Sequence, residues 1–187
     1  MNKKKLIGTI IGVIAFGVLI AGATFAWLTY SFNATNGTYN LGSMNFNVDF
    51  VKGTAITSIP TLSTATPSTA ESLMVKAKKA SSSAPGDLTI YLNTDSENTD
   101  STLMASTAIN YAVCVGTCAS FDSITTKGTL TSSTPAKFAI LEDTPLTNDY
   151  TEYNIYFWID SSKINNDLLN TSYTGYISAE AEQVDTR

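Results

Sequence analysis

Residues 153–160 read Tyr153-Asn154-Ile155-Tyr156-Phe157-Trp158-Ile159-Asp160. Every second side chain, beginning with Tyr153, is large and apolar, whereas the positions between them carry Asn154, two amphipathic rings and Asp160. Successive side chains of a β-strand point to opposite faces of the sheet, so a period of two residues indicates a strand with one buried face. The stretch therefore predicts a β-strand that turns Tyr153, Ile155, Phe157 and Ile159 toward a core.

The same alternation recurs on both sides of this stretch. It predicts strands at Met44–Phe50, Leu88–Leu92 (after a Pro85-Gly86-Asp87 turn), Ile109–Val115 and Tyr173–Glu182, with shorter strands at Leu73–Ala77 and Phe138–Leu141. One helical turn around Ile164–Leu169 is expected between the last two strands. About seven strands without an amphipathic helix of core length predict an all-β fold, an antiparallel two-sheet β-sandwich of the jelly-roll or Ig-like type. The domain is expected over residues 39–187, with its packed part ending near Gln183.

An apolar segment precedes this domain. Lys3-Lys4-Lys5 is followed by apolar residues from Leu6 to Leu28, which is long enough to cross a bilayer and longer than the core of an ordinary signal peptide. Positive charge ahead of such a segment holds the N-terminus on the cytoplasmic side. Residues 1–26 are therefore predicted to be either a signal peptide or a retained signal anchor.

Small residues at the end of this segment favour cleavage. Thr24 and Ala26 supply the small side chains that a signal peptidase requires at −3 and −1, so cleavage after Ala26 would leave Trp27 as the first residue of the mature protein. Ala21-Gly22-Ala23 offers a similar site. The product would be secreted or would lie at the extracellular cell surface, and a retained helix would instead anchor it in the membrane.

Residues 27–38 connect the apolar segment to the domain. Leu28, Tyr30 and Phe32 alternate with small polar residues, which predicts a strand with one apolar face ahead of an Asn/Gly-rich linker. Such a strand can add to the open edge of a neighbouring molecule, in the manner of strand donation, or can pair with its own sheet. Both arrangements remain open at this point.

Composition excludes several kinds of function. The chain of 187 residues has a formal net charge of −5, and no basic patch with interleaved aromatic residues occurs, so no nucleic-acid partner is expected. It contains no His, which excludes a HExxH zinc site and catalytic arrangements of the Ser-His-Asp or Cys-His kind. No spacing singles out a pair of carboxylates. We therefore expect no enzyme activity, no metal and no cofactor.

The acidic segment between Asp95 and Asp100 could wrap a calcium ion, but it lacks the Gly and the distal Glu of an EF-hand loop. A solvated loop between strands is the favoured interpretation.

Two cysteines lie close together in Cys114-Val115-Gly116-Thr117-Cys118. In an exported protein this spacing favours a disulfide at the tip of a hairpin over two free thiols.

Four aromatic residues are expected on the outward faces of the predicted strands: Tyr91, Tyr156, Trp158 and Tyr176. They could form a surface stripe for a partner, or loops could cover them. We favour coverage by loops.

Two regions of the chain resemble the TasA/camelysin family of Gram-positive proteins. Residues 21–28, Ala-Gly-Ala-Thr-Phe-Ala-Trp-Leu, resemble the export signal of that family, and Asn40–Phe46 resembles its first strand. Near the other end, Tyr156–Asp160 and Tyr173–Ile177 resemble closing strands of small proteins exported with it. The resemblance implies cleavage by a dedicated SipW-type signal peptidase, a jelly-roll-like sandwich and, in the best-known members, fibres of a biofilm matrix. The Cys114–Cys118 spacing departs from the family pattern.

Two functions remain in competition. The first is an exported structural protein of the cell surface or extracellular matrix that assembles with itself or with other matrix proteins. The second is a monomeric, membrane-tethered binding module that displays its Tyr/Trp face. Camelysin-type relatives suggest a metalloprotease as well, but the missing His excludes the zinc site that such an enzyme needs.

Overall fold

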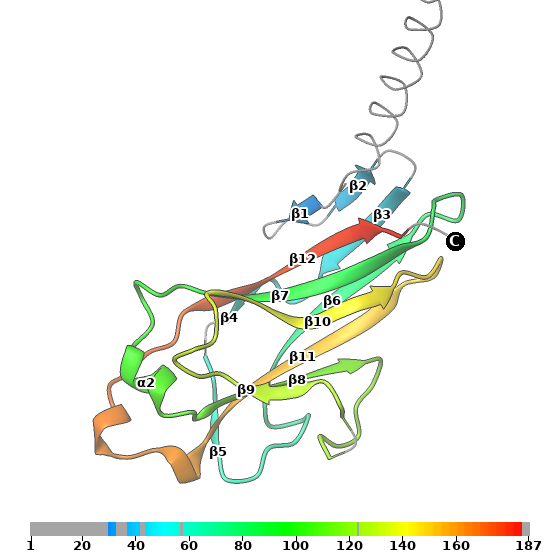
Figure 1. Cartoon of the computed structure of the whole chain (residues 1–187). Helices are drawn as coiled ribbons and strands as arrows, with labels where there is room; N and C mark the ends of the chain where they lie inside the picture. The colour runs from blue at the N-terminus through cyan, green and yellow to red at the C-terminus, as the bar shows by residue number, and fades with distance from the viewer. Residues whose placement is uncertain (1–29, 33–36, 42–43, 57, 123, 185–187) are drawn as a thin grey trace, which may run out of the picture.

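Two β-sheets lie face to face and enclose the hydrophobic core (Figure 1). The computed structural model describes residues 30–32, 37–41, 44–56, 58–122 and 124–184. Neighbouring strands pair antiparallel in both sheets, apart from one short parallel pair. The structure therefore confirms the prediction of an all-β, two-sheet sandwich.

The first sheet has five strands in the order β1-β12-β7-β10, with β4 added alongside β12. Their bounds are β1 Tyr30–Phe32, β4 Ala55–Ile56, β7 Gly86–Thr94, β10 Lys137–Pro145 and β12 Gly175–Gln183. The second sheet has seven strands in the order β2-β3-β6-β11-β8-β9, with β5 added to β11 in parallel. Their bounds are β2 Gly37–Leu41, β3 Met44–Phe50, β5 Thr61–Leu62, β6 Glu71–Lys79, β8 Ile109–Val115, β9 Lys127–Thr129 and β11 Thr151–Asp160.

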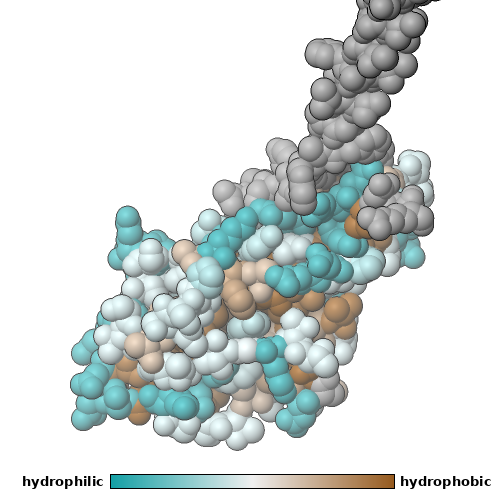
Figure 2. All heavy atoms as spheres, in the orientation of Figure 1, coloured by the Kyte–Doolittle hydropathy of each residue, from teal (hydrophilic) through white to brown (hydrophobic). Residues whose placement is uncertain are grey.

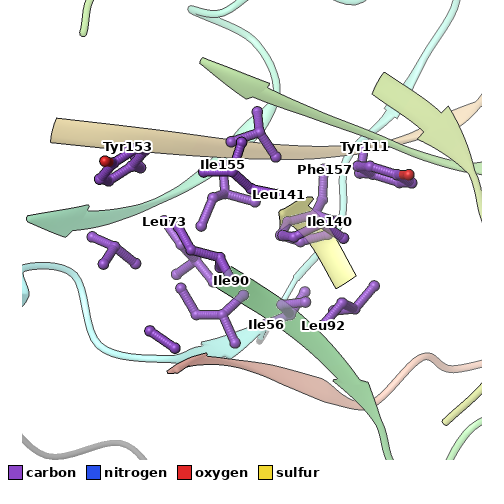
Figure 3. Packing of buried hydrophobic residues seen from close by; sticks show 14 of the residues in the cluster. Ile56, Leu73, Ile90, Leu92, Tyr111, Ile140, Leu141, Tyr153, Ile155 and Phe157 are labelled. Carbon is purple, nitrogen blue, oxygen red and sulfur yellow. The ribbon is translucent and has the colours of Figure 1, made fainter. Parts of the chain in front are cut away.

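The core lies between β7, β10 and β12 of one sheet and β6, β8 and β11 of the other (Figure 3). In β11, Tyr153, Ile155 and Phe157 have no exposed surface, as the alternating pattern predicts. The facing strand β7 contributes Ile90 and Leu92, which are also fully buried. Inner faces of period-two strands from both sheets thus form one continuous apolar layer.

Most predicted strands agree with the structure, and the differences lie at short elements. Gly86 and Asp87, expected in a turn, open β7 because they pair with Gln183 and Glu182 of β12. Tyr173, expected in the last strand, precedes it, since β12 begins at Gly175. The sandwich has more strands than the seven expected, because two- and three-residue strands such as β4, β5 and β9 are too short to show a period.

Short helices cluster at one end of the sandwich. The predicted helical turn is two 3₁₀ helices, η1 (Ser161–Lys163) and η2 (Asn166–Leu168), between β11 and β12. A further helix that the sequence analysis missed, α2 (Ser101–Ala105), contacts η2. We call this end, with loops 95–100 and 131–136, the α2 end. In Figure 1 it lies at the end of the sandwich opposite to β1 and the last residues of β12.

Two adjacent residues of β7 test whether this strand has one core face and one outer face. Ile90→Ala should lower the free energy of unfolding by about 2–5 kcal/mol, because it leaves a cavity in the core. Thr89 lies half-buried on the opposite face, so Thr89→Ala should change the free energy of unfolding by less than about 1 kcal/mol. Urea unfolding of the full chain measures both variants. Equal losses would show that β7 does not separate a core face from an outer face.

Candidate functional site

The outer face of β11 carries a second, smaller group of apolar side chains. The Phe121 ring stacks on Trp158 with ring centres 4.9 Å apart and an angle of 9° between the planes. It also meets the Tyr156 ring edge-on at 5.2 Å. With Ala112 and Cys114 of β8, these three rings form what we call the aromatic cluster.

A disulfide holds the start of the loop that supplies Phe121. The structure places the sulfur atoms of Cys114 and Cys118 at disulfide distance, with their Cα atoms 6.1 Å apart. Gly116 between them has a φ of +74°, a conformation that favours glycine. Its N–H donates to the Glu152 carbonyl at 2.7 Å, and its own carbonyl accepts from the Asn154 amide at 2.7 Å. The loop is therefore tied to β8 by the disulfide and to β11 by these two hydrogen bonds.

The four outward aromatic residues do not form one stripe. Tyr156 and Trp158 belong to the seven-stranded sheet and lie under Phe121, so Tyr156 is only 8% exposed. Tyr91 and Tyr176 belong to β7 and β12 of the other sheet. Coverage by a loop, the favoured interpretation, thus describes the two rings of β11.

Tyr91 lies within a charged group on the outer face of the five-stranded sheet. The Lys137 ammonium sits 4.1 Å from the centre of its ring and forms an ion pair with Glu180. Burial raises the pKa of the Tyr91 hydroxyl, and the nearby Glu180 carboxylate raises it further. Glu180 itself is only 8% exposed. Because a buried carboxylate needs a partner, Lys137 accounts for the presence of this charge on β12.

The carboxylates of the acidic segment serve the backbone around them. Asp95 accepts from the backbone N–H groups of Glu97 and Asn98 and from the Asn98 amide, and the Asn98 side chain is the largest cause of its lowered pKa. Asp100 caps α2 by accepting from the Thr102 N–H at 2.8 Å. Within the described residues, no group of three or more His, Cys, Asp or Glu side chains could hold a metal ion. The carboxylates of Asp95 and Asp100 therefore hold the shape of their own loop.

Other titratable groups with shifted pKa values also have structural roles. Burial raises the pKa of Tyr111 and Tyr173, whose rings pack against the core. Asp160 caps η1, and the Ser162 hydroxyl and N–H that donate to its carboxylate lower its pKa. Burial, with the charge of Asp143, raises the pKa of Asp87. Each shift comes from packing or capping.

The edge of β12 is the second candidate site. β1 pairs with it over Tyr30↔Ala181, Ser31↔Glu180 and Phe32↔Ala179. β4 pairs at Gly175 and Tyr176, and the Ile177 N–H donates to the Thr54 carbonyl at 3.0 Å. The β1 segment thus lies on a sheet of its own chain, which is the intramolecular arrangement, while β2 pairs with β3 in the other sheet.

The predicted cleavage residues Thr24, Ala26 and Trp27 lie outside the described residues, as does the whole of the predicted signal segment 1–26. In the part of the chain that the structure describes, no helix combines the length and the apolar character needed to span a bilayer.

Comparisons of this chain with protein-family models, with curated proteins and with solved structures gave no match.

Removing Phe121 tests the aromatic cluster. In a Trp27→Phe background, Trp158 is the one remaining tryptophan of the chain. Phe121→Ala should shift its fluorescence to longer wavelength and lower the free energy of unfolding by about 1–3 kcal/mol, because the stacked ring and its buried area are lost.

Two controls accompany this variant. Val115→Ala, at the end of β8 between the two cysteines and 57% exposed, should leave the emission unchanged. Reduction of the disulfide should shift the emission in the same direction as Phe121→Ala. Emission that is the same before and after removal of Phe121 would mean that this ring does not cover Trp158.

Proposed function

We propose that this chain is an exported structural protein of the cell surface or extracellular matrix that assembles with copies of itself by strand addition. Three features support export and the family: the Lys-rich apolar segment 1–26, the small residues ahead of Trp27, and the motifs that resemble the TasA/camelysin family. The all-β two-sheet architecture agrees with the jelly-roll-like sandwich that this resemblance implies.

The observation that carries the proposal is that short, separate segments cover the edge of β12. β1 pairs with residues 179–181, while β4 and the Thr54 carbonyl cover residues 175–177. If β1 detaches, the N–H and C=O groups that it covered can pair with another chain. The free edge of β10, at the other side of the same sheet, is protected by two register irregularities and by Pro145. Strand addition is therefore directed to β12.

The strand that can be exchanged is already present in each molecule. β1 belongs to the five-stranded sheet, while β2, which follows after four intervening residues, belongs to the seven-stranded sheet. If β1 leaves its own β12 and pairs with β12 of the next molecule, the same main-chain hydrogen bonds form again. Each molecule then donates one strand and receives one. Such head-to-tail repetition does not close on itself and produces a filament.

The alternative, a monomeric tethered module with a Tyr/Trp face, has less surface available. Trp158 and Tyr156 are packed against Phe121, and Tyr91 lies under Lys137. Tyr176 remains exposed and lies on the other sheet. We therefore favour the structural role, and we propose no catalytic step, since the chain contains no His.

We place the protein outside the cell, delivered by a SipW-type signal peptidase and held in the membrane only until cleavage. Cleavage after Ala26 should yield a mature protein that begins with Trp27, because Thr24 and Ala26 meet the small-residue requirement. Intact-mass measurement of protein from the culture medium tests this. A full-length mass found only in the membrane fraction would instead establish a retained anchor.

A cysteine pair distinguishes exchange of β1 from its closed form. Ser31 and Glu180 are directly opposite in the β1–β12 register, and such positions are close enough for a disulfide. In the variant Ser31→Cys/Glu180→Cys, monomers should cross-link within the chain, whereas polymers should yield a ladder of covalent multimers on a non-reducing gel. The partner of Glu180, Lys137, is 46% exposed, so water can replace that contact.

Each outcome of the cross-linking experiment has a different meaning for assembly. Polymers that release only monomers after oxidation would show that assembly does not exchange β1, and a chain that never polymerises would overturn self-assembly. Deletion of residues 27–32 is the matched control. A folded monomer without polymers supports donation, whereas loss of folding shows that the strand is essential to its own domain.

A further inference from the structure

A hollow of about 190 Å³ lies at the α2 end, between the loop after β7, the helix α2 and the loop before β10. Met104 and Ala136 supply apolar surface to it, and the remaining lining residues are all Ser and Thr. In Figure 2, the loops at this end are mainly teal and white, and the largest brown area lies in the middle of that face. The hollow is thus lined mostly by Ser and Thr, but more of its surface is apolar than polar.

Its walls are held by hydrogen bonds from the lining threonines. Thr94 Oγ1 lies 3.0 Å from the Tyr173 hydroxyl, and the Thr99 hydroxyl donates to the Thr174 carbonyl at 3.0 Å. On the opposite wall, Thr134 Oγ1 accepts from the Thr131 N–H at 2.9 Å. These contacts fix two loops that are far apart in sequence, so the hollow is formed before any ligand arrives.

Three serine hydroxyls of the lining have no such role. Ser96, Ser101 and Ser132 come from three separate segments, and none of their hydroxyls hydrogen-bonds to a described part of the protein. Each can both donate and accept a hydrogen bond. Three hydroxyls around one hollow therefore offer a set of contacts to a ligand that itself carries several hydroxyls.

The charge of the lining narrows the class of ligand. Asp95 and Asp100 are sequence neighbours of lining residues, but their carboxylates accept hydrogen bonds from the N–H groups of Glu97, Asn98 and Thr102. No charged side chain belongs to the lining. Because an ion loses hydration when it enters a site without a partner, an uncharged ligand is favoured.

From these observations we propose that the hollow binds a neutral carbohydrate, one sugar ring at a time. The three serine hydroxyls contact hydroxyls of the sugar, and Met104, which is 9% exposed, packs against the C–H face of the ring. The volume is below the range of about 300–1,000 Å³ found for drug-sized ligands, which restricts the site to a single ring of a glycan.

The location of the site separates it from assembly. β1 and the residues of β12 that it covers, 179–181, lie at the end of the sandwich opposite to α2 (Figure 1). Binding at the α2 end therefore leaves the β12 edge unobstructed, and a polymer of this protein would present one sugar site per molecule. Failure of either proposal leaves the other intact.

Methyl NMR of methionine tests the proposal directly. The full chain is labelled with ¹³C at its methionine methyl groups in micelles of a zwitterionic detergent that has no sugar group, and the methyl glycosides of glucose, galactose, mannose and N-acetylglucosamine are added in turn. We expect a saturable shift of the Met104 signal with at least one of them. Met74, half-buried on β6, should keep its position and serves as the internal control.

Serine variants connect the shift to the hollow. Ser96→Ala, Ser101→Ala and Ser132→Ala should each weaken binding about 3- to 10-fold, the effect of one lost hydrogen bond. Ser82→Ala, in the exposed turn between β6 and β7 and outside the lining of the hollow, should leave sugar binding unchanged. Because the three serines are exposed, we expect each variant to fold. An unaltered Met74 signal verifies this. Absence of a Met104 shift with all four sugars, or equal binding by all variants, would overturn the proposal. A larger shift with glucuronate than with glucose would show that the ligand is charged.

Discussion

The structure depends on the burial of one period-two strand on both of its faces. β11 turns Tyr153, Ile155 and Phe157 into the core between the sheets, and none of the three has exposed surface. Its outer face carries the aromatic cluster in the middle and the ion pair of Lys76 with Glu152 near its start, and β5 pairs beside its last residues within the sheet. Because β6 and β8 pair along both sides of β11, the position of every strand in the seven-stranded sheet follows from this one.

The disulfide loop extends that burial to the outside of the sheet. A sheet face that carries Tyr156 and Trp158 would expose a large apolar area if it stayed open. Phe121 covers both rings, and the disulfide and Gly116 hold the start of its loop on β8 and β11. The covalent link shortens a flexible connection, so less conformational entropy is lost when Phe121 packs. The cysteines thus support a local packing arrangement, while the fold as a whole rests on the inner core.

The two ends of the sandwich have different chemistry. One end holds β1 on three residues of β12 through main-chain hydrogen bonds, and the proposed assembly exchanges these bonds between molecules. The other end gathers loops whose threonines bond to Tyr173 and to one another and whose serine hydroxyls line the hollow. An assembly contact made through backbone and a ligand contact made through side chains can therefore operate in the same molecule, since neither uses the residues of the other.

Local sequence determined the strands and the fold class, because a strand buried on one face needs only a period of two. Met44–Phe50 and Ile109–Val115 have the same bounds in the sequence pattern and in the structure. The absence of His, which excludes a HExxH zinc site and His-dependent triads, is likewise a property of the sequence alone. Tertiary structure decided what the pattern left open. Whether Trp158 is displayed or covered depended on Phe121, which lies in a loop with no period. The charge of Glu180 is paired with Lys137 on β10, which strand order places across β7 from β12. The hollow at the α2 end joins Ser96 to Ser132, residues with no signal in either segment. Burial on one face is encoded by neighbours along the chain, whereas contacts between loops depend on how the sheets bring distant segments together.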